Sequence, residues 1–237
     1  MKLTPDLIEV YRRDGVVPIG KVLDDATVAE AKEHIEALRQ RDLLDNPAEG
    51  SDKKSFRLLM VSSFDEWFRS IIKNDNLLDA AESVLGPNVQ YFQDNIFWKP
   101  PTQGAATTWH QDNVWWDADP PNMATVWIAL DDADASNGGV HYVRGSQTHL
   151  LDGEEEVNDA KAGRYFLLTD EQVDASRAVS FTVPAGHAVM HHCQTIHGAP
   201  PNRSDRSRCG FTVHLQEAGL KGQDVNECPI LRGKMPA

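Results

Sequence analysis

The chain has 237 residues, enough for one domain that buries a hydrophobic core without disulfides or a structural metal. It carries 23 Lys and Arg against 36 Asp and Glu, a net charge of −13, and the scattered basic residues disfavour binding to a nucleic-acid backbone. Cys193, Cys209 and Cys228 lack CxxC spacing, which indicates neither a disulfide framework nor a cysteine zinc site. We find no apolar signal core and no membrane-length apolar run, and therefore expect a cytoplasmic protein without a membrane partner.

The first third of the chain has helical patterns. Thr4 suits an N-cap, Pro5 suits the first helical position and Gly15 suits a helix stop. Residues 25–44 repeat apolar side chains at spacings of three and four, which predicts an amphipathic helix. Shorter helices are expected at residues 64–73 and 77–85.

From residue 88 onward the pattern changes to short β-like runs separated by turn signals. We expect strands at residues 89–98, 124–130, 140–143, 179–183, 188–192 and 211–215. Because no helices alternate with these strands, an antiparallel barrel or sandwich with helices packed outside is favoured over a parallel sheet. Residues 152–174 are rich in charge and have little period, so we expect an inserted loop or lid there.

These patterns predict one domain spanning residues 1–237. Within it we expect a mostly helical part at 1–87, a β core at 88–217 and a C-terminal tail at 218–237.

A candidate metal site begins with the run TTWHQDN. If it is a strand, His110 and Asp112 point to the same face and offer a nitrogen and an oxygen to one ion. His197 supplies a third ligand where a strand is expected to end before a Gly/Pro-rich turn. Two His and one carboxylate leave open coordination positions, as in ferrous oxygenases.

The HxD pattern alone is weak evidence, since a surface turn and an ordinary turn histidine explain these residues equally well. Arg208 adds a further element, because it stands eleven positions after His197 on the following strand. A guanidinium there can fork onto the far carboxylate of a dicarboxylate cofactor that chelates the iron with its other end.

The chain resembles the phytanoyl-CoA dioxygenase-like family over residues 91–216. The resemblance is carried by the runs WHQDN, TVWIALDDADASNGG, YVRGSQTH and HGAPPNRS, followed by Arg208. It implies an α+β protein with a mainly β core: a cupin-like double-stranded β-helix, or jelly roll, with the N-terminal helices outside. It also implies Fe(II) bound by His110, Asp112 and His197, with 2-oxoglutarate and O2 as cosubstrates. Arg208 is implied to bind 2-oxoglutarate, and Trp127 and Thr107 to lie against it.

Two positions depart from the family pattern. Ala199 stands where members often carry a hydroxyl residue that bonds the cofactor carboxylate, so cofactor binding is expected to depend more on Arg208. Arg144 replaces the usual proline of the turn near the pocket rim. The carboxylate of Asp112 favours hydroxylation over halogenation, because related halogenases carry a small residue there.

The resemblance implies oxidation of a small molecule, such as hydroxylation, with release of succinate and CO2, but does not fix the substrate. Candidate substrate residues flank the expected ligand strand and the nearby turn: Trp115, Trp116, His141 and Arg144. Core packing is the alternative for the tryptophans, which in a strand would point to opposite faces, and a solvated charge is the alternative for Arg144.

Two other functions remain open at this point. One is a catalytically silent metabolite-binding module on the same fold. The other is a cupin-like metalloenzyme that needs no cosubstrate and gives Arg208 no special role.

Overall fold

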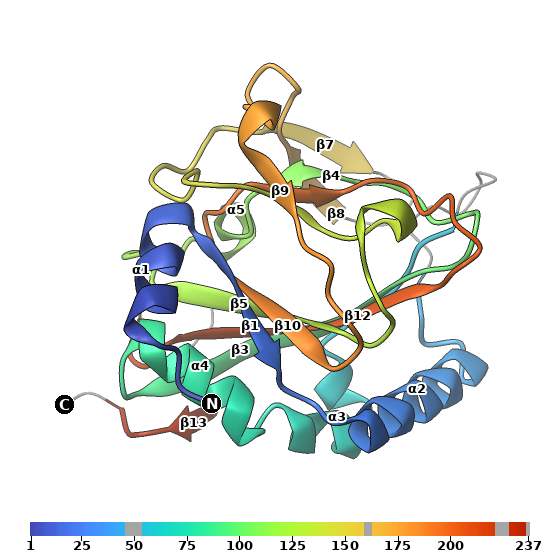
Figure 1. Ribbon diagram of the computed structural model, residues 1–237, viewed down its shortest axis with the longest axis horizontal. Coiled ribbons are helices and arrows are strands. Elements are labelled where there is room, and N and C mark those ends of the chain that lie inside the picture. The colour runs from blue at the N-terminus through green and yellow to red at the C-terminus, as the bar shows by residue number, and fades with distance from the viewer. Residues whose placement is uncertain (46–53, 159–162, 221–227, 236–237) are drawn as a thin grey trace.

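The computed structural model describes residues 1–45, 54–158, 163–220 and 228–235. Two antiparallel sheets face each other, and helices cover the outer face of the larger sheet (Figure 1). The larger sheet has the strand order β1-β10-β5-β12-β3-β13, with β2 also paired to β3, and the smaller has the order β4-β11-β6-β9. This arrangement is the expected double-stranded β-helix with outer helices.

The helices are α1 Pro5–Asp14, α2 Asp25–Gln40, α3 Glu66–Ile71, α4 Asp75–Leu85 and α5 Asn113–Trp116, with 3-10 turns η1 Val61–Ser63, η2 Ala135–Asn137 and η3 Ala175–Arg177. The strands are β1 Val16–Lys21, β2 Phe56–Leu59, β3 Val89–Lys99, β4 Thr107–His110, β5 Met123–Ala129, β6 His141–Val143, β7 Glu154–Asn158, β8 Gly163–Leu167, β9 Ala178–Ser180, β10 His187–His192, β11 His197–Ala199, β12 Arg208–Glu217 and β13 Ile230–Arg232.

The predicted ends of α1 are confirmed. The Thr4 side chain accepts a hydrogen bond from the amide of Leu7, and Gly15 ends the helix in the left-handed conformation at φ 74°. The expected second helix is four residues too long, because α2 ends at Gln40. Asp42 has φ 57°, a left-handed conformation that α-helix geometry does not accept.

The six predicted strands correspond to β3, β5, β6, β9, β10 and β12, with shifted ends. The N-terminal part also contributes β1 and β2 to the larger sheet, and the C-terminal tail contributes β13. Pro18 lies within β1, which is possible because β1 is an edge strand of that path.

The expectation of a loop at 152–174 is wrong for much of that segment. It contains the antiparallel hairpin β7–β8, whose residues pair from Glu154 with Leu167 to Asn158 with Gly163. Residues 159–162 lie outside the described chain. The residue that follows the hairpin bonds to β4: the amide of Leu168 donates to the carbonyl oxygen of Trp109 at 3.0 Å. A role for the segment as a lid stays a prediction.

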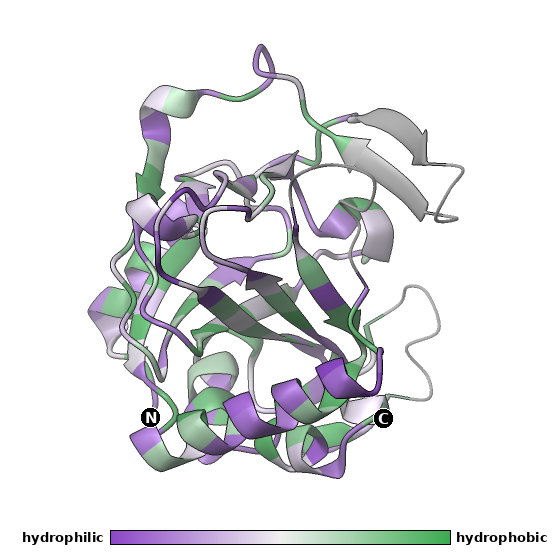
Figure 2. Cartoon of the chain, turned by 90° about the vertical axis from the view of Figure 1, so that its right-hand side faces the viewer, coloured by the Kyte–Doolittle hydropathy of each residue, from purple (hydrophilic) through white to green (hydrophobic). Residues whose placement is uncertain are grey.

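The main hydrophobic core lies between the larger sheet and the helices. Phe68 of α3 packs on Phe211 of β12, with ring centroids 5.1 Å apart. Figure 2 shows these helices beneath the sheet, with polar and apolar residues alternating around each. With one face of the sheet occupied by this core, the other face is left to form the interior between the two sheets.

Among the described residues, no helix is long and apolar enough to span a membrane.

Candidate active site

His110 and His197 are brought together by strand pairing. His110 is the last residue of β4, His197 is the first of β11, and the two are direct partners in the antiparallel register. Partners of this kind place their side chains on the same face of the sheet. Their ring centroids are 4.2 Å apart. The expectation that His197 ends a strand is therefore wrong, because a strand begins there.

Asp112 reaches the same point by a different route from the one expected. The strand ends at His110, and Asp112 has helical dihedrals, φ −58° and ψ −37°, directly before α5. The amide of Asn113 donates to the carbonyl oxygen of Cys193 at 2.9 Å and fixes this turn. A strand-to-helix turn, and not alternation along a strand, thus presents the carboxylate.

The three side chains form a group that can hold a metal ion. Their ligand atoms lie within 4.8 Å of one another, and Asp112 Oδ1 is 3.8 Å from His110 Nε2 and 3.6 Å from His197 Nε2. Each imidazole places Nδ1 on a backbone carbonyl oxygen, that of Thr108 at 2.8 Å or of Thr195 at 2.9 Å. A carbonyl oxygen accepts only, so Nδ1 carries the proton and Nε2 is left with a lone pair for a metal.

The protonation states suit a divalent cation. Burial lowers the pKa of His110 and of His197 to about 4, so both rings are neutral at neutral pH. Burial opposes ionisation of Asp112, but His197 and a hydrogen bond from His191 outweigh it and hold its pKa well below the usual range. The group therefore offers two neutral nitrogens and one anionic oxygen.

A second cluster contains two buried basic side chains. Arg208 begins β12 and Lys99 ends β3, and the two are partners in the register. Arg208 Nε and Nη2 donate to the carbonyl oxygen of Gly138 at 2.9 and 2.6 Å, and Lys99 Nζ donates to those of Ala199 and Pro200 at 3.1 and 2.9 Å. Within the described ranges, neither forms an ion pair with a carboxylate. Burial, with Arg208 close by, lowers the pKa of Lys99 to about 6, so this amine is largely neutral at neutral pH. An anion bound beside it would raise this pKa and complete a cationic pair with Arg208.

Aromatic side chains surround this cationic pair. The guanidinium of Arg208 lies 5.5 Å from the ring centroid of Trp127 on β5. Tyr142 of β6 stacks on His197, with centroids 6.1 Å apart, and its buried hydroxyl has no hydrogen-bond partner in the described chain. Such an orphaned hydroxyl fits a site that receives a polar ligand.

The structure separates the candidate substrate residues. Trp115 and Trp116 lie on the short helix α5 and not on a strand, which corrects that expectation. Trp115 packs against His110 with ring centroids 5.3 Å apart, whereas Trp116 is buried against Phe92 and His214.

His141, Arg144 and Thr107 occupy three different environments. His141 is half-buried next to Trp109, on the face of β6 opposite to Tyr142. Arg144 is exposed and lies close enough to Asp14 to help lower the pKa of that carboxyl, after the larger effect of Arg13. Its guanidinium therefore matches the alternative of a solvated surface charge. Thr107 is exposed at the start of β4, opposite Ala199.

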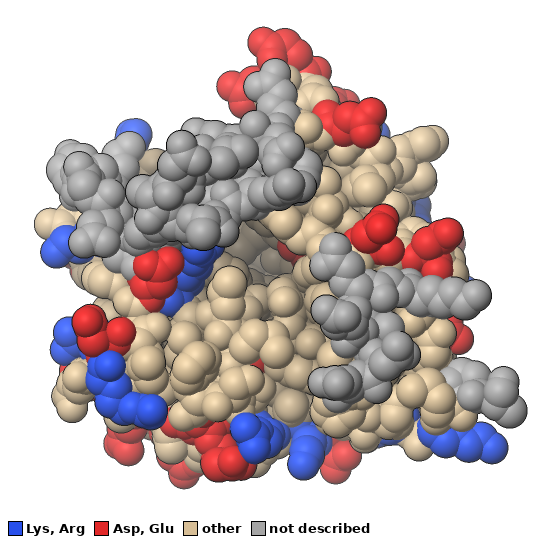
Figure 3. Space-filling model, turned by 180° about the vertical axis from the view of Figure 1, so that it is seen from behind, with Lys and Arg blue, Asp and Glu red and all other residues tan. Residues whose placement is uncertain are grey.

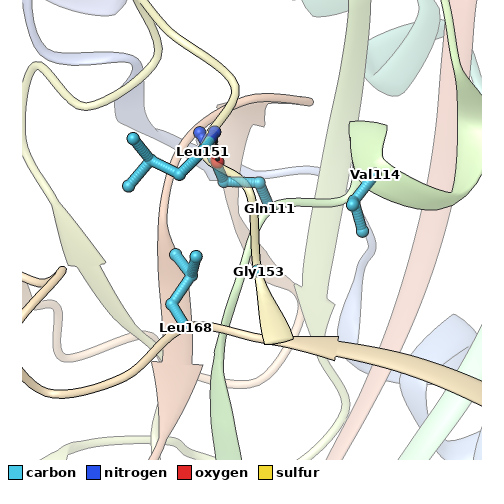
Figure 4. Close-up of a pocket in the computed structure, with 5 residues that line it drawn as sticks. All are labelled: Gln111, Val114, Leu151, Gly153 and Leu168. Carbon is cyan, nitrogen blue, oxygen red and sulfur yellow. Dashed lines mark hydrogen bonds between the residues drawn. The ribbon is translucent and has the colours of Figure 1, made fainter. Parts of the chain in front are cut away.

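Gln111, between two of the candidate ligands, faces away from them. Its Nε2 donates to the carbonyl oxygens of His149 and Gln194, and its Oε1 accepts from the amide of Leu151. Figure 4 shows it beside Leu151 and Leu168, with Val114 on the other side of a small, mainly apolar pocket. This pocket lies beside the turn that carries Asp112, and none of its lining residues is titratable.

Sequence reasoning missed Lys99, Thr125, His191 and His214, which lie close to the candidate ligands or the cationic pair. One signal was present in β3, where Gln93, Asn95 and Lys99 stand at odd positions and Ile96 and Trp98 of the main core at even ones, with Asp94 and Phe97 as exceptions. A polar stripe at period two on an otherwise buried strand indicates a polar interior.

On the face seen in Figure 3, the Lys and Arg of the described residues are interspersed with Asp and Glu, and the surface is hollowed near its centre.

A double-stranded β-helix that gathers two His and one carboxylate beside a buried arginine defines the class of iron- and 2-oxoglutarate-dependent oxygenases. Within this class, the chain belongs to the phytanoyl-CoA dioxygenase (PhyH) family, whose sequence profile matches residues 11–210.

Similar proteins agree with this assignment. An L-proline trans-4-hydroxylase of Streptomyces griseoviridis is 27% identical over 221 residues, covering 86% of this chain and 82% of that protein. A probable alpha-ketoglutarate-dependent hypophosphite dioxygenase of Stutzerimonas stutzeri is 28% identical over 137 residues, covering 57% of this chain but only 48% of that protein. The crystal structure of the non-heme alpha-ketoglutarate-dependent carbocyclase SnoK has the same fold, with a TM-score of 0.79 and 22% identity, covering 95% of this chain and 88% of SnoK.

Proposed function

We propose that this chain is an Fe(II)- and 2-oxoglutarate-dependent oxygenase that oxidises a small molecule, with release of succinate and CO2. One observation carries the proposal: three metal-ligating atoms converge near two buried basic side chains that lack a carboxylate partner in the described chain, and Tyr142 lies close to both groups. Metal ligands alone would suit many cupin-like enzymes. The cationic pair adds a site for an anionic cosubstrate.

His110, Asp112 and His197 are proposed to hold the iron through Nε2, Oδ1 and Nε2, because these atoms face one another. When bound, iron would activate O2 with 2-oxoglutarate as the co-reductant, a chemistry that no side chain of the protein provides. The protein's own contribution is to orient the groups and to exclude water.

Arg208 and Lys99 are proposed to bind the far carboxylate of 2-oxoglutarate. The bonds from Arg208 to the Gly138 carbonyl use Nε and Nη2, so Nη1 remains as a donor. Lys99 Nζ donates to the backbone carbonyl of Ala199, the position without the usual hydroxyl, and a cosubstrate carboxylate bound there would keep this amine protonated as a further donor. Trp127 and Tyr142 would pack against the cosubstrate and keep the site dry. Thr107 remains a weaker candidate for this site.

Two relatives support a small-molecule substrate, since one is an L-proline trans-4-hydroxylase and the other a probable hypophosphite dioxygenase. Trp115 is proposed to contact the substrate, because it is half-buried and packs directly on the candidate ligand His110. His141 and Arg144 are weaker candidates, given their positions.

Anaerobic titration tests the proposal. Adding Fe(II) and then 2-oxoglutarate should produce a visible charge-transfer band, which His110→Ala and Asp112→Ala should abolish. Arg208→Met should raise the 2-oxoglutarate concentration at half-saturation roughly 10- to 100-fold, because a charged hydrogen bond contributes about 1.5–3 kcal/mol. Lys99→Met should weaken binding in the same direction.

Arg206→Gln is the matched control, since Arg206 is exposed and pairs with Asp134. It should leave the titration unchanged. Absence of the band in the wild-type protein would contradict the proposal and favour a metalloenzyme that needs no cosubstrate, and 2-oxoglutarate affinity that survives Arg208→Met would contradict the role proposed for Arg208.

A further inference from the structure

A chain of buried hydrogen bonds ends on the metal-facing carboxylate. Asn95 Oδ1 accepts from the amide of Met60 at 3.3 Å, and Asn95 Nδ2 lies 2.9 Å from His214 Nε2. His214 Nδ1 lies 2.8 Å from Thr125 Oγ1, which donates to Asp112 Oδ2 at 2.9 Å. The four side chains that these hydrogen bonds link are all buried: Asn95, His214, Thr125 and Asp112.

The strand register builds this chain. His214 of β12 is the direct partner of Thr125 of β5, and Asn95 of β3 is the partner of Thr212, two residues before His214. The side chains therefore lie on the inner face of the larger sheet, across three neighbouring strands. Trp116 packs against the His214 ring, with centroids 4.8 Å apart and planes at 71°, and limits its rotation.

The direction of every bond is fixed by its first donor. A backbone N–H can only donate, so Asn95 turns its oxygen to Met60 and its NH2 to His214. The NH2 can only donate, so His214 Nε2, which also lies 3.2 Å from the hydroxyl oxygen of Thr212, accepts and the ring proton sits on Nδ1. That proton goes to Thr125 Oγ1, which leaves the hydroxyl hydrogen of Thr125 for Asp112.

Asp112 Oδ2 also receives a hydrogen bond from His191 Nε2 at 3.2 Å. Two donors thus engage Oδ2, while Oδ1 faces the two candidate histidine ligands. We propose that Asn95, His214 and Thr125 are positioning residues: their hydrogen bonds hold Oδ2 and present Oδ1 alone to the metal. This inference rests on the proposed function of the triad. A carboxylate that binds through one oxygen leaves coordination positions for the cosubstrate and O2.

Metal affinity tests the last link of the chain. Thr125→Val keeps the shape of the side chain but cannot donate to Oδ2, whereas Thr125→Ser keeps the donor. With Co(II) as the probe, in equilibrium dialysis without 2-oxoglutarate, Thr125→Val should bind roughly 10- to 100-fold more weakly, and Thr125→Ser should stay near the wild type.

The outcomes of this experiment separate two failures. A wild-type protein that binds no Co(II) would overturn the function proposed for the triad. Equal affinity of the wild type and a folded Thr125→Val variant would overturn the positioning role alone.

The tautomer of His214 tests the direction of these hydrogen bonds and needs no metal. In nitrogen-15 NMR of the metal-free wild-type protein, His214 should be neutral with its proton on Nδ1. A proton on Nε2 would reverse the donors and overturn the inference. Asn95→Asp should move a proton onto His214 Nε2, because a carboxylate beside that nitrogen can only accept. An unchanged Nδ1–H tautomer in Asn95→Asp would also contradict the proposed direction.

Discussion

Gly210 lies within β12, where the absence of a side chain makes room for the indole of Trp127. A Cβ added there would approach Trp127 Cζ2 to 2.5 Å and Cε2 to 2.6 Å, closer than real contacts permit. The indole is a rigid ring in a buried strand, so it would have to move. Because Arg208 lies over the same ring, the effect should reach the cationic pair.

Gly210→Ala should therefore destabilise the protein by about 1–3 kcal/mol and weaken 2-oxoglutarate binding. Urea denaturation and 2-oxoglutarate titration of the charge-transfer band measure the two effects. Trp127→Phe removes the clashing atoms, so Gly210→Ala should cost less stability in a Trp127→Phe background. Equal costs in both backgrounds would show that the indole is not the obstacle.

At the residue scale, the sequence pointed to the triad and Arg208 because each belongs to a motif with fixed spacing. Thr125 and His214 carry no such motif. They act, in the proposal above, through partners on neighbouring strands, and those neighbours follow from sheet register and not from sequence distance.

At the scale of elements, α3 shows how a single cap decides a boundary. The sequence predicts a helix from residue 64, but α3 begins at Glu66. Asp65 is the N-cap: its Oδ1 accepts from the amides of Trp67 and Phe68, and its Oδ2 lies 2.8 Å from Nδ1 of His34 on α2. The cap therefore joins two helices.

Asp65→Ala should lower the free energy of unfolding by about 1–2 kcal/mol, because it removes the acceptor for the helix amides. Asp65→Asn is the matched control, since an amide oxygen still caps the helix, and it should retain most of the stability. Chemical denaturation followed by circular dichroism measures both. If both variants lose the same stability, the link to His34, and not the cap, would be the dominant contribution.

The six predicted strands did not include β4 and β11. These have four and three residues, too few for a period of two to stand out, yet their pairing positions the two histidines. The longer strands β3, β5 and β12 were found because each contains several β-branched or aromatic residues.

At the scale of the whole molecule, buried histidines couple stability to pH. Burial lowers the pKa of both His192 and His214 to about 4, from an ordinary value of 6.5. Between these values the unfolded chain binds protons that the folded chain does not. Stability should therefore fall as the pH decreases from about 6.5 towards 4.

In the metal-free protein, each such histidine should contribute a slope of up to about 1.4 kcal/mol per pH unit in that window. Urea denaturation at pH 7, 6 and 5 measures it. His192→Asn keeps an acceptor for the amide of Gln194, which bonds His192 Nδ1 at 3.1 Å, but does not titrate. That variant should show a shallower slope, and an unchanged slope would rule out His192 as a source of the effect.

The sequence by itself determined the architecture and the chemistry of the centre. Sustained apolar periods specify helices followed by strands, and the HxD motif, His197 and Arg208 specify a family and a set of ligand types, because these signals are local or fixed in spacing. Only the tertiary structure decided how Asp112 is presented, that Lys99 lies beside Arg208, and that Thr125, itself bonded to His214, donates to the second carboxylate oxygen. These contacts join strands far apart in the chain, and their geometry depends on the register in which the sheets close.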